Sequence, residues 1–168
     1  MMHTFEMTDL SLLHYFLGLE VKQGKGSIFV LQQRYAVDLL KKFNMEHLNE
    51  AATPMNINEK LQLDDGSGEA DAKQYCGVVG MIYLAHSQPD ISYSVGVVSR
   101  LNNPSKLHYG AVKRIMRYIA GTTQYGILYE KISDLKLTEY SNSDWGGSLD
   151  DRRSTSGNLF TLGSGAIT

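Results

Sequence analysis

Hydrophobic and polar positions alternate with several different periods along the chain, and each change of period predicts a different element. Aromatic and branched residues dominate from Tyr15 to Val21, glycines at 24 and 26 interrupt them, and a strand-like pattern resumes from Ile28 to Leu31. Two such runs around a glycine-containing turn predict a β-hairpin.

The next segment carries its apolar residues at helical spacing. The apolar side chains recur three or four positions apart, and the opposite face is charged. The apolar set is Ala36, Leu39, Leu40 and Phe43, and the charged set is Arg34, Asp38, Lys41 and Lys42. This pattern predicts an amphipathic helix.

Residues 49–73 have no sustained period. The segment is polar, contains Pro54 and includes the run "DDGSGE". Such a composition favours an extended linker that joins two packed units.

Residues 74–123 contain apolar stripes that predict a cluster of three helices. Gly77 and Gly80 lack side chains and so permit a close helix crossing, and Pro89 and Pro104 separate the helices. The three stripes are Tyr75, Val78, Val79 and Ile82; Ile91, Val95 and Val98; and Ala111, Val112, Ile115 and Ile119.

The pattern changes to short strands in residues 124–168. "YGILYEK" and "LKLTEYSNSD" are strand-like, "ISD" forms the turn between them, and "SGNLFTLGSGAIT" supplies one or two further strands. The alternation in "LKLTEY" is typical of a half-buried strand. The sequence therefore predicts an α+β fold that ends in an antiparallel β-meander.

Composition excludes several classes of protein. The chain has 168 residues and a net charge of −2, so its overall charge does not favour non-specific attraction to nucleic acid. Cys76 is the single cysteine, which excludes an intrachain disulfide framework and a cysteine-based zinc site. The sequence shows no signal peptide and no membrane-spanning run, so it predicts an intracellular protein of undefined compartment without a membrane partner.

Two groups of charged residues are candidates for chemistry. Asp144, Asp150 and Asp151 form an acidic cluster, which suits either a divalent-metal site or a solvated polar turn. A basic group on the third predicted helix lies near Tyr109 and Tyr118, and it suits either phosphate contacts or a solvent-exposed helix face. The basic group is Lys106, Lys113, Arg114 and Arg117. The histidines show no metal-ligand spacing, and no nucleophile–base pair stands out.

Several long strings resemble one family in the family's own order. "FEMTDLSLLHYFLGLEV", "LQQRYAVDLLKKFNM" and "TPMN" resemble the segment after the catalytic core of a copia-type LTR retrotransposon reverse transcriptase. "VGMIYLAHSQPDISYSVGVVSRLNNPSKLHYGAVKRIMRYIAGT" resembles the connection region of that Pol polyprotein. "LTEYSNSDWGGSLDDRRSTSGNLFTLGSGAIT" resembles the opening of its ribonuclease H domain.

The resemblance implies a role for each range. Residues 1–48 correspond to a primer-grip and thumb fragment at the edge of the palm, 49–73 to a linker, 74–123 to the helical connection and 124–168 to a truncated ribonuclease H-like domain. It also implies that the primer-grip turn contacts nucleic acid through Tyr15, Phe16, Leu17 and Gly18.

Departures from the family pattern predict an inactive chain. The polymerase aspartates of the family precede the first matching string, and the later ribonuclease H acids lie beyond the last one. The family has Asp where this chain has Asn142, at the first metal position of ribonuclease H. The parent family uses Mg²⁺, whereas this chain is expected to be a truncated, non-enzymatic fragment without catalytic residues, metal or cofactor.

Two functions remain open at this point. The first is a fragment that binds RNA–DNA or DNA duplex at most weakly. The alternative is a co-opted, effector-like module that binds an unknown protein partner.

Overall fold

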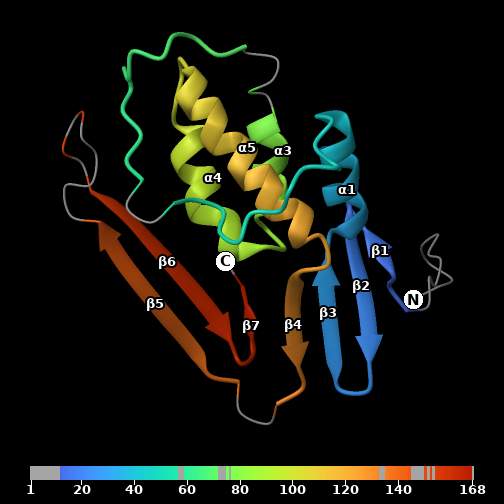
Figure 1. Cartoon of the computed structure of the whole chain (residues 1–168). Helices are drawn as coiled ribbons and strands as arrows, with labels where there is room; N and C mark the ends of the chain where they lie inside the picture. The colour runs from blue at the N-terminus through green and yellow to red at the C-terminus, as the bar shows by residue number, and fades with distance from the viewer. Residues whose placement is uncertain are drawn as a thin grey trace, which may run out of the picture.

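The structure is a computed structural model, and it confirms the α+β class, with helices packed beside antiparallel sheets (Figure 1). It describes residues 12–56, 59–71, 75, 77–132, 135–144, 150, 152 and 154–167. None of the helices formed by these residues has the length and apolar character that a membrane crossing needs.

The first sheet contains the predicted hairpin. Its strands are β1 (Tyr15–Phe16), β2 (Leu19–Gly24), β3 (Ser27–Leu31) and β4 (Gly126–Glu130), all antiparallel and in the order β1-β2-β3-β4. Gly26 occupies a left-handed conformation with φ of 87° in the β2–β3 turn, which a residue without a side chain adopts at little cost.

The position of β4 corrects the expected strand pairing. The sequence predicts that this strand pairs with the next one through "ISD", but β4 pairs with β3 instead, from Leu31↔Gly126 to Ser27↔Glu130. Residues 133 and 134 of that turn lie outside the described residues. The close pairing requires glycine at 126, because a Cβ there would lie 2.3 Å from the Val30 carbonyl oxygen.

The second sheet is the predicted antiparallel meander. It contains β5 (Leu137–Asp144), β6 (Thr155–Leu162) and β7 (Gly165–Ala166), in the order β5-β6-β7. β7 lies beside β4, where the Tyr129 hydroxyl donates to the Ala166 carbonyl oxygen at 2.6 Å. The two sheets therefore meet at β4 and β7, as Figure 1 shows.

The helices gather above the two sheets in Figure 1. They are α1 (Gln33–Lys42), α3 (Gly77–Leu84), α4 (Ser92–Ser99) and α5 (Lys106–Gly121), with a 3₁₀ turn, η1 (Pro89–Ile91), before α4. This confirms the amphipathic helix after the hairpin and the three helices beyond the linker.

One hydrophobic core joins segments from both sides of the linker. Ala36, Leu39 and Leu40 of α1 pack in the same cluster as the buried faces of α3, α4 and α5. A Cβ on Gly80 would lie 2.5 Å from Leu39 Cδ1, and one on Gly77 would lie 2.4 Å from Met116 Cε. The predicted close helix crossing is thus confirmed. The sequence also predicted two separately packed units, but α1 and the later helices share one core. The assignment of 1–48, 49–73, 74–123 and 124–168 to polymerase and ribonuclease H subdomains stays a prediction.

The buried face of α3 also differs from the predicted stripe. Val79 is 70% exposed and Ile82 is 44% exposed, while Val78, Met81 and Leu84 are buried. Because the helix is apolar on every side, hydrophobic periodicity alone does not define which face packs inward.

Candidate nucleic-acid interface

The basic helix α5 begins at a well-defined cap. Ser105 Oγ accepts a hydrogen bond from the His108 backbone N–H at 3.2 Å, and the Ser105 N–H donates to His108 Nδ1 at 3.0 Å. This reciprocal capping satisfies two backbone donors at the helix start. It fixes the first turn of α5, which carries Lys106, and the later turns of the same helix carry the other three basic side chains.

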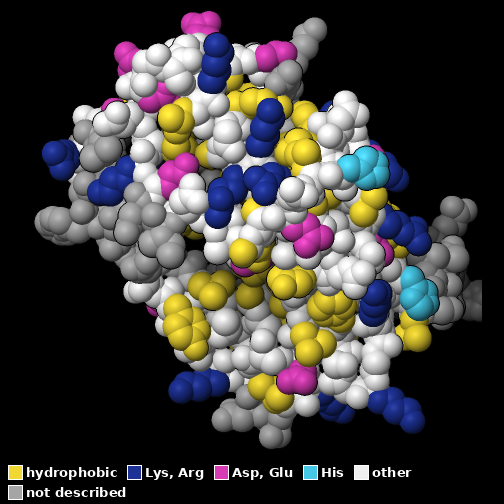
Figure 2. All heavy atoms as spheres, viewed as in Figure 1, with side chains coloured by type: hydrophobic (Ala, Val, Ile, Leu, Met, Phe, Trp, Pro, Cys, Tyr) yellow, Lys and Arg dark blue, Asp and Glu magenta, His cyan; other side chains and the backbone are white. Residues whose placement is uncertain are grey.

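Two of the predicted cations lie open to solvent on α5. Lys106 and Lys113 are exposed, and the Lys113 ammonium lies 4.5 Å from the centre of the Tyr109 ring. Figure 2 shows Lys and Arg side chains grouped over α5 in the upper centre of the molecule, with acidic side chains nearby. At a rise of about 1.5 Å per residue, Lys106 and Arg117 lie roughly 16 Å apart along the helix axis.

The two arginines are half-buried, and both bind the linker. Arg114 Nη2 donates to Thr53 Oγ1 at 2.8 Å, and Arg117 Nε donates to the Asn49 carbonyl oxygen at 2.5 Å. The Ala51 N–H in turn donates to the Arg117 carbonyl oxygen at 3.2 Å. Half of the predicted basic group therefore has a structural role in addition to its charge.

The sequence did not predict that the acidic part of the linker is bound to α5. The contacts of Gln62 and Asp65 with Ser105 and His108 are called the clamp. Asp65 accepts a hydrogen bond from Ser105 Oγ, which is the largest contribution to holding the pKa of its carboxyl near 2, below the ordinary 3.8. His108 is fully buried, and its Nε2 lies 2.8 Å from the Gln62 carbonyl oxygen. The linker is thereby attached to the start of α5. A serine followed three positions later by a histidine was the available sequence signal.

The primer-grip-like turn lies elsewhere on the molecule. Leu17 and Gly18 both have positive φ, at 48° and 81°, and the Tyr83 hydroxyl donates to the Leu17 carbonyl oxygen. Tyr15 and Phe16 are more than half exposed, at 53% and 56%. In Figure 1, α1 lies between this turn and α5, so the fold does not bring the two predicted contact regions together.

The acidic turn of the second sheet is placed only in part. Asn142 lies on β5 opposite Gly157 of β6, and its side chain is outside the described part of the chain, as is the whole of Asp151. Asp150 Oδ2 accepts a hydrogen bond from the Leu63 N–H at 2.9 Å, so this carboxylate binds the linker. Within the described residues, no group of three or more His, Cys, Asp or Glu side chains is arranged to hold a metal ion.

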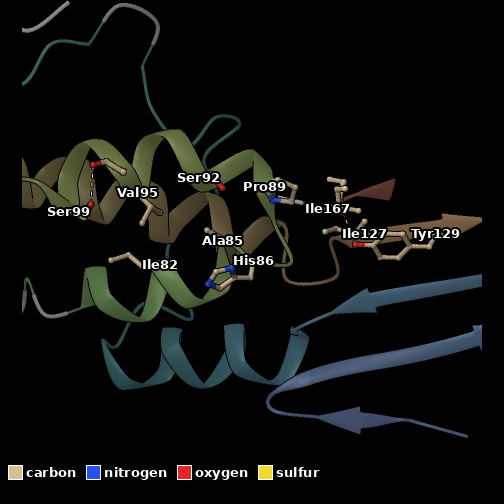
Figure 3. Close-up of a pocket in the computed structure, with 12 residues that line it drawn as sticks. Ile82, Ala85, His86, Pro89, Ser92, Val95, Ser99, Ile127, Tyr129 and Ile167 are labelled. Atoms are coloured by element: carbon tan, nitrogen blue, oxygen red, sulfur yellow. Dashed lines mark hydrogen bonds between the residues drawn. The ribbon is translucent and has the colours of Figure 1, made fainter. Parts of the chain in front are cut away.

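A mostly apolar cavity of about 410 Å³ lies between the helices and the junction of the two sheets. Figure 3 shows Ile82, Val95 and Ile127 on its walls, with Tyr129 near its far end. The Tyr129 hydroxyl already donates to Ala166, so this group is not free for a ligand.

Comparison with known proteins identifies relatives over nearly the whole chain. The "Retrovirus-related Pol polyprotein from transposon RE2" of Arabidopsis thaliana is 41% identical over 95% of this chain and 11% of its own length. An uncharacterized mitochondrial protein of the same plant is 34% identical over 98% of this chain and 69% of its own length. The "Secreted RxLR effector protein 161" of Plasmopara viticola is 38% identical over 56% of this chain and 68% of its own length. No family model and no solved structure matches the chain.

The relatives that match nearly the full chain at 41–42% identity are Pol polyproteins of retrovirus-like transposons. The chain belongs to the copia-type retrotransposon Pol polyprotein family, which confirms the resemblance seen in the sequence. It spans about a tenth of the length of those polyproteins, 11% of each of the two at that identity.

Proposed function

We infer that this chain is a non-catalytic segment of a Pol polyprotein that contacts the phosphates of a nucleic-acid duplex through α5. The observation that carries this function is the pair of exposed lysines on α5, Lys106 and Lys113, with the half-buried Arg114 and Arg117 on the same helix. Cations that are not neutralised by neighbouring acids attract phosphates and release counterions when they bind.

The expected binding is weak and independent of base sequence. The overall charge of −2 opposes the attraction between α5 and phosphates. Arg114 and Arg117 also already donate hydrogen bonds to the linker. Lys106 and Lys113 are therefore the main contributors. Phosphate contacts of this kind position a duplex but carry no sequence information.

The primer-grip-like turn provides a second contact. The turn exposes the aromatic rings of Tyr15 and Phe16, and its backbone has positive φ at Leu17 and Gly18. These groups are expected to contact the sugar–phosphate backbone. Since α1 separates the turn from α5, each surface is expected to act independently of the other.

The absence of ribonuclease H activity follows in this proposal from Asn142. An amide in place of the family's aspartate supplies a carbonyl oxygen without the negative charge that a two-metal site uses to hold divalent ions. Asn142→Asp alone is expected to leave the purified chain inactive on an RNA–DNA hybrid with Mg²⁺ or Mn²⁺. Reproducible cleavage by the parent chain or by this variant would refute the proposal of a non-catalytic segment.

Duplex binding is tested by its dependence on salt. The affinity of an RNA–DNA hybrid is measured by fluorescence anisotropy at several salt concentrations for the parent chain and for a Lys106→Glu, Lys113→Glu variant. Loss of two phosphate contacts should reduce the slope of log K against log salt by about 2. A Lys131→Glu, Lys136→Glu variant carries the same change in net charge on exposed residues away from α5. Equal slopes in the two variants would show that α5 has no specific role.

A second candidate function is protein binding, which the similarity to an effector protein favours. A segment that packs against other parts of Pol is expected to self-associate through exposed apolar side chains such as Val79, which is 70% exposed. An independent interaction module is expected to stay monodisperse. Size-exclusion chromatography with light scattering over a range of concentrations distinguishes the two.

A further inference from the structure

A second cavity, of about 510 Å³, lies where η1, the end of α5 and the start of β4 meet. Its walls combine aromatic rings with two acceptor-bearing side chains, and no role assigned above involves them. The lining includes Phe29, Gln88, Pro89, Asp90, Tyr118 and Tyr125.

Gln88 supplies a buried acceptor without a donor. The side chain is 2% exposed, and its Nε2 donates to the Thr122 carbonyl oxygen at 2.5 Å. That bond requires the nitrogen of the amide, so it fixes which atom is the oxygen and leaves Oε1 without a hydrogen-bond partner. A buried acceptor of this kind favours any ligand that brings an N–H to it.

Asp90 adds a negative charge two positions along the chain. Its carboxylate is exposed and accepts a hydrogen bond from the Tyr118 hydroxyl at 2.5 Å. Burial, followed by this hydrogen bond, raises the pKa of Tyr118 well above its ordinary value, so the tyrosine remains a neutral donor. No cation of the described residues forms an ion pair with Asp90. The carboxylate can therefore accept further donors.

The aromatic walls favour a flat cation. Tyr125 is 54% exposed and Phe29 is half-buried, and both line the cavity. A guanidinium group is planar, carries only donors, pairs with carboxylates and stacks on aromatic faces. A nucleobase would instead bring a phosphate backbone toward the Asp90 carboxylate, which repels it.

We propose that this cavity binds the guanidinium group of an arginine side chain on a partner polypeptide. One edge of the guanidinium donates to Asp90, and its face lies against Tyr125. A further N–H donates to Gln88 Oε1, which is buried and becomes reachable when the cavity wall shifts. This interaction is separate from the duplex contacts proposed for α5, because it uses an acidic and aromatic site rather than a basic one.

The test is a titration of ¹⁵N-labelled chain with the blocked peptide acetyl-Gly-Arg-Gly-amide, followed by NMR. Saturable shifts are expected in the side-chain amide of Gln88 and the backbone amide of Gly126. Two control peptides replace the arginine. Citrulline has a planar group of the same shape without the positive charge, and lysine has the positive charge without a planar group. Each is expected to bind at least tenfold more weakly.

Asp90→Asn removes the charge but retains an oxygen that accepts from Tyr118, and it is expected to weaken arginine binding at least tenfold. Asp38→Asn changes an exposed aspartate of α1 and serves as the matched control. The spectrum of each variant reports whether it is folded. Several results would overturn the proposal. They are shifts that do not saturate or that scatter over the molecule, equal binding of the citrulline peptide, and unchanged binding by the Asp90→Asn variant. Tighter binding of free arginine than of the peptide, or shifts caused by a single-stranded oligonucleotide in place of the peptide, would overturn it as well.

Discussion

Replacement of Gly126 by alanine tests the pairing that joins β4 to the hairpin. A Cβ at this position would lie 2.3 Å from the Val30 carbonyl oxygen and 2.8 Å from Leu31 Cβ. Ordinary contacts of a Cβ begin at 3.4 Å, so the added Cβ and the Val30 oxygen must move apart by more than 1 Å. The obstructing oxygen belongs to the backbone of β3, which is held between β2 and β4 and cannot rotate away.

The expected cost follows from two opposing effects. Overpacking of a rigid site costs about 1–3 kcal/mol, and the backbone contact places this substitution near the upper end. Alanine also reduces the entropy of the unfolded chain, which returns about 0.4–1 kcal/mol. The free energy of unfolding should therefore fall by about 2 kcal/mol.

The matched control is Gly157→Ala, a glycine of β6 with no atom within 4 Å of the added Cβ. This substitution should leave stability unchanged or raise it by up to about 1 kcal/mol. Urea unfolding followed by circular dichroism measures both variants, and a loss of 2 kcal/mol lowers the midpoint by about 1 M. Equal midpoints for the parent chain and Gly126→Ala would refute the close pairing of β3 with β4.

Three other predictions concern the clamp and the core. The free energy of unfolding should decline as the pH falls from about 4 to 2. The pKa of Asp65 is lower in the folded chain than its ordinary value, so the ionised carboxylate stabilises the fold fully above the ordinary pKa, and this stabilisation is lost as the pH falls through the folded pKa. Urea midpoints across this range should vary less for Asp65→Asn than for the parent chain. Tyr75→Phe removes the hydrogen bond to the Val98 carbonyl oxygen at 2.6 Å and should lower the free energy of unfolding by about 1 kcal/mol in the same assay. Met81→Ala empties a fully buried position and should cost about 2–5 kcal/mol, and a thermal midpoint equal to that of the parent chain would contradict the packing of α3.

Local periodicity was sufficient to predict most of the elements. The β2–β3 hairpin, α1 and the three later helices each depend on residues that are close in sequence, where a period of 2 or 3.6 separates strands from helices. The buried face of α3 was not predictable in this way, since Val78, Val79, Met81 and Ile82 are all apolar. Packing decides between such faces, and glycines at 77 and 80 let neighbouring helices approach one of them.

Long-range contacts limited what the sequence could predict about the candidate site. Helical geometry correctly placed the basic residues on α5, but the bonds from Arg114 to Thr53 and from Arg117 to Asn49 join residues 61 and 68 positions apart. No local pattern encodes such partners. The clamp at Asp65 was missed for the same reason, because its serine and histidine partners lie about 40 residues away, at the start of α5.

Lysine footprinting tests most directly whether α5 contacts a duplex. The chain is acetylated with and without an RNA–DNA hybrid at low salt, and mass spectrometry measures the modification of each lysine. Lys106 and Lys113 should be protected by the hybrid, whereas the exposed Lys131 and Lys136 should react equally in both samples. Equal protection at all four positions, or protection confined to Lys131 and Lys136, would contradict a duplex interface on α5.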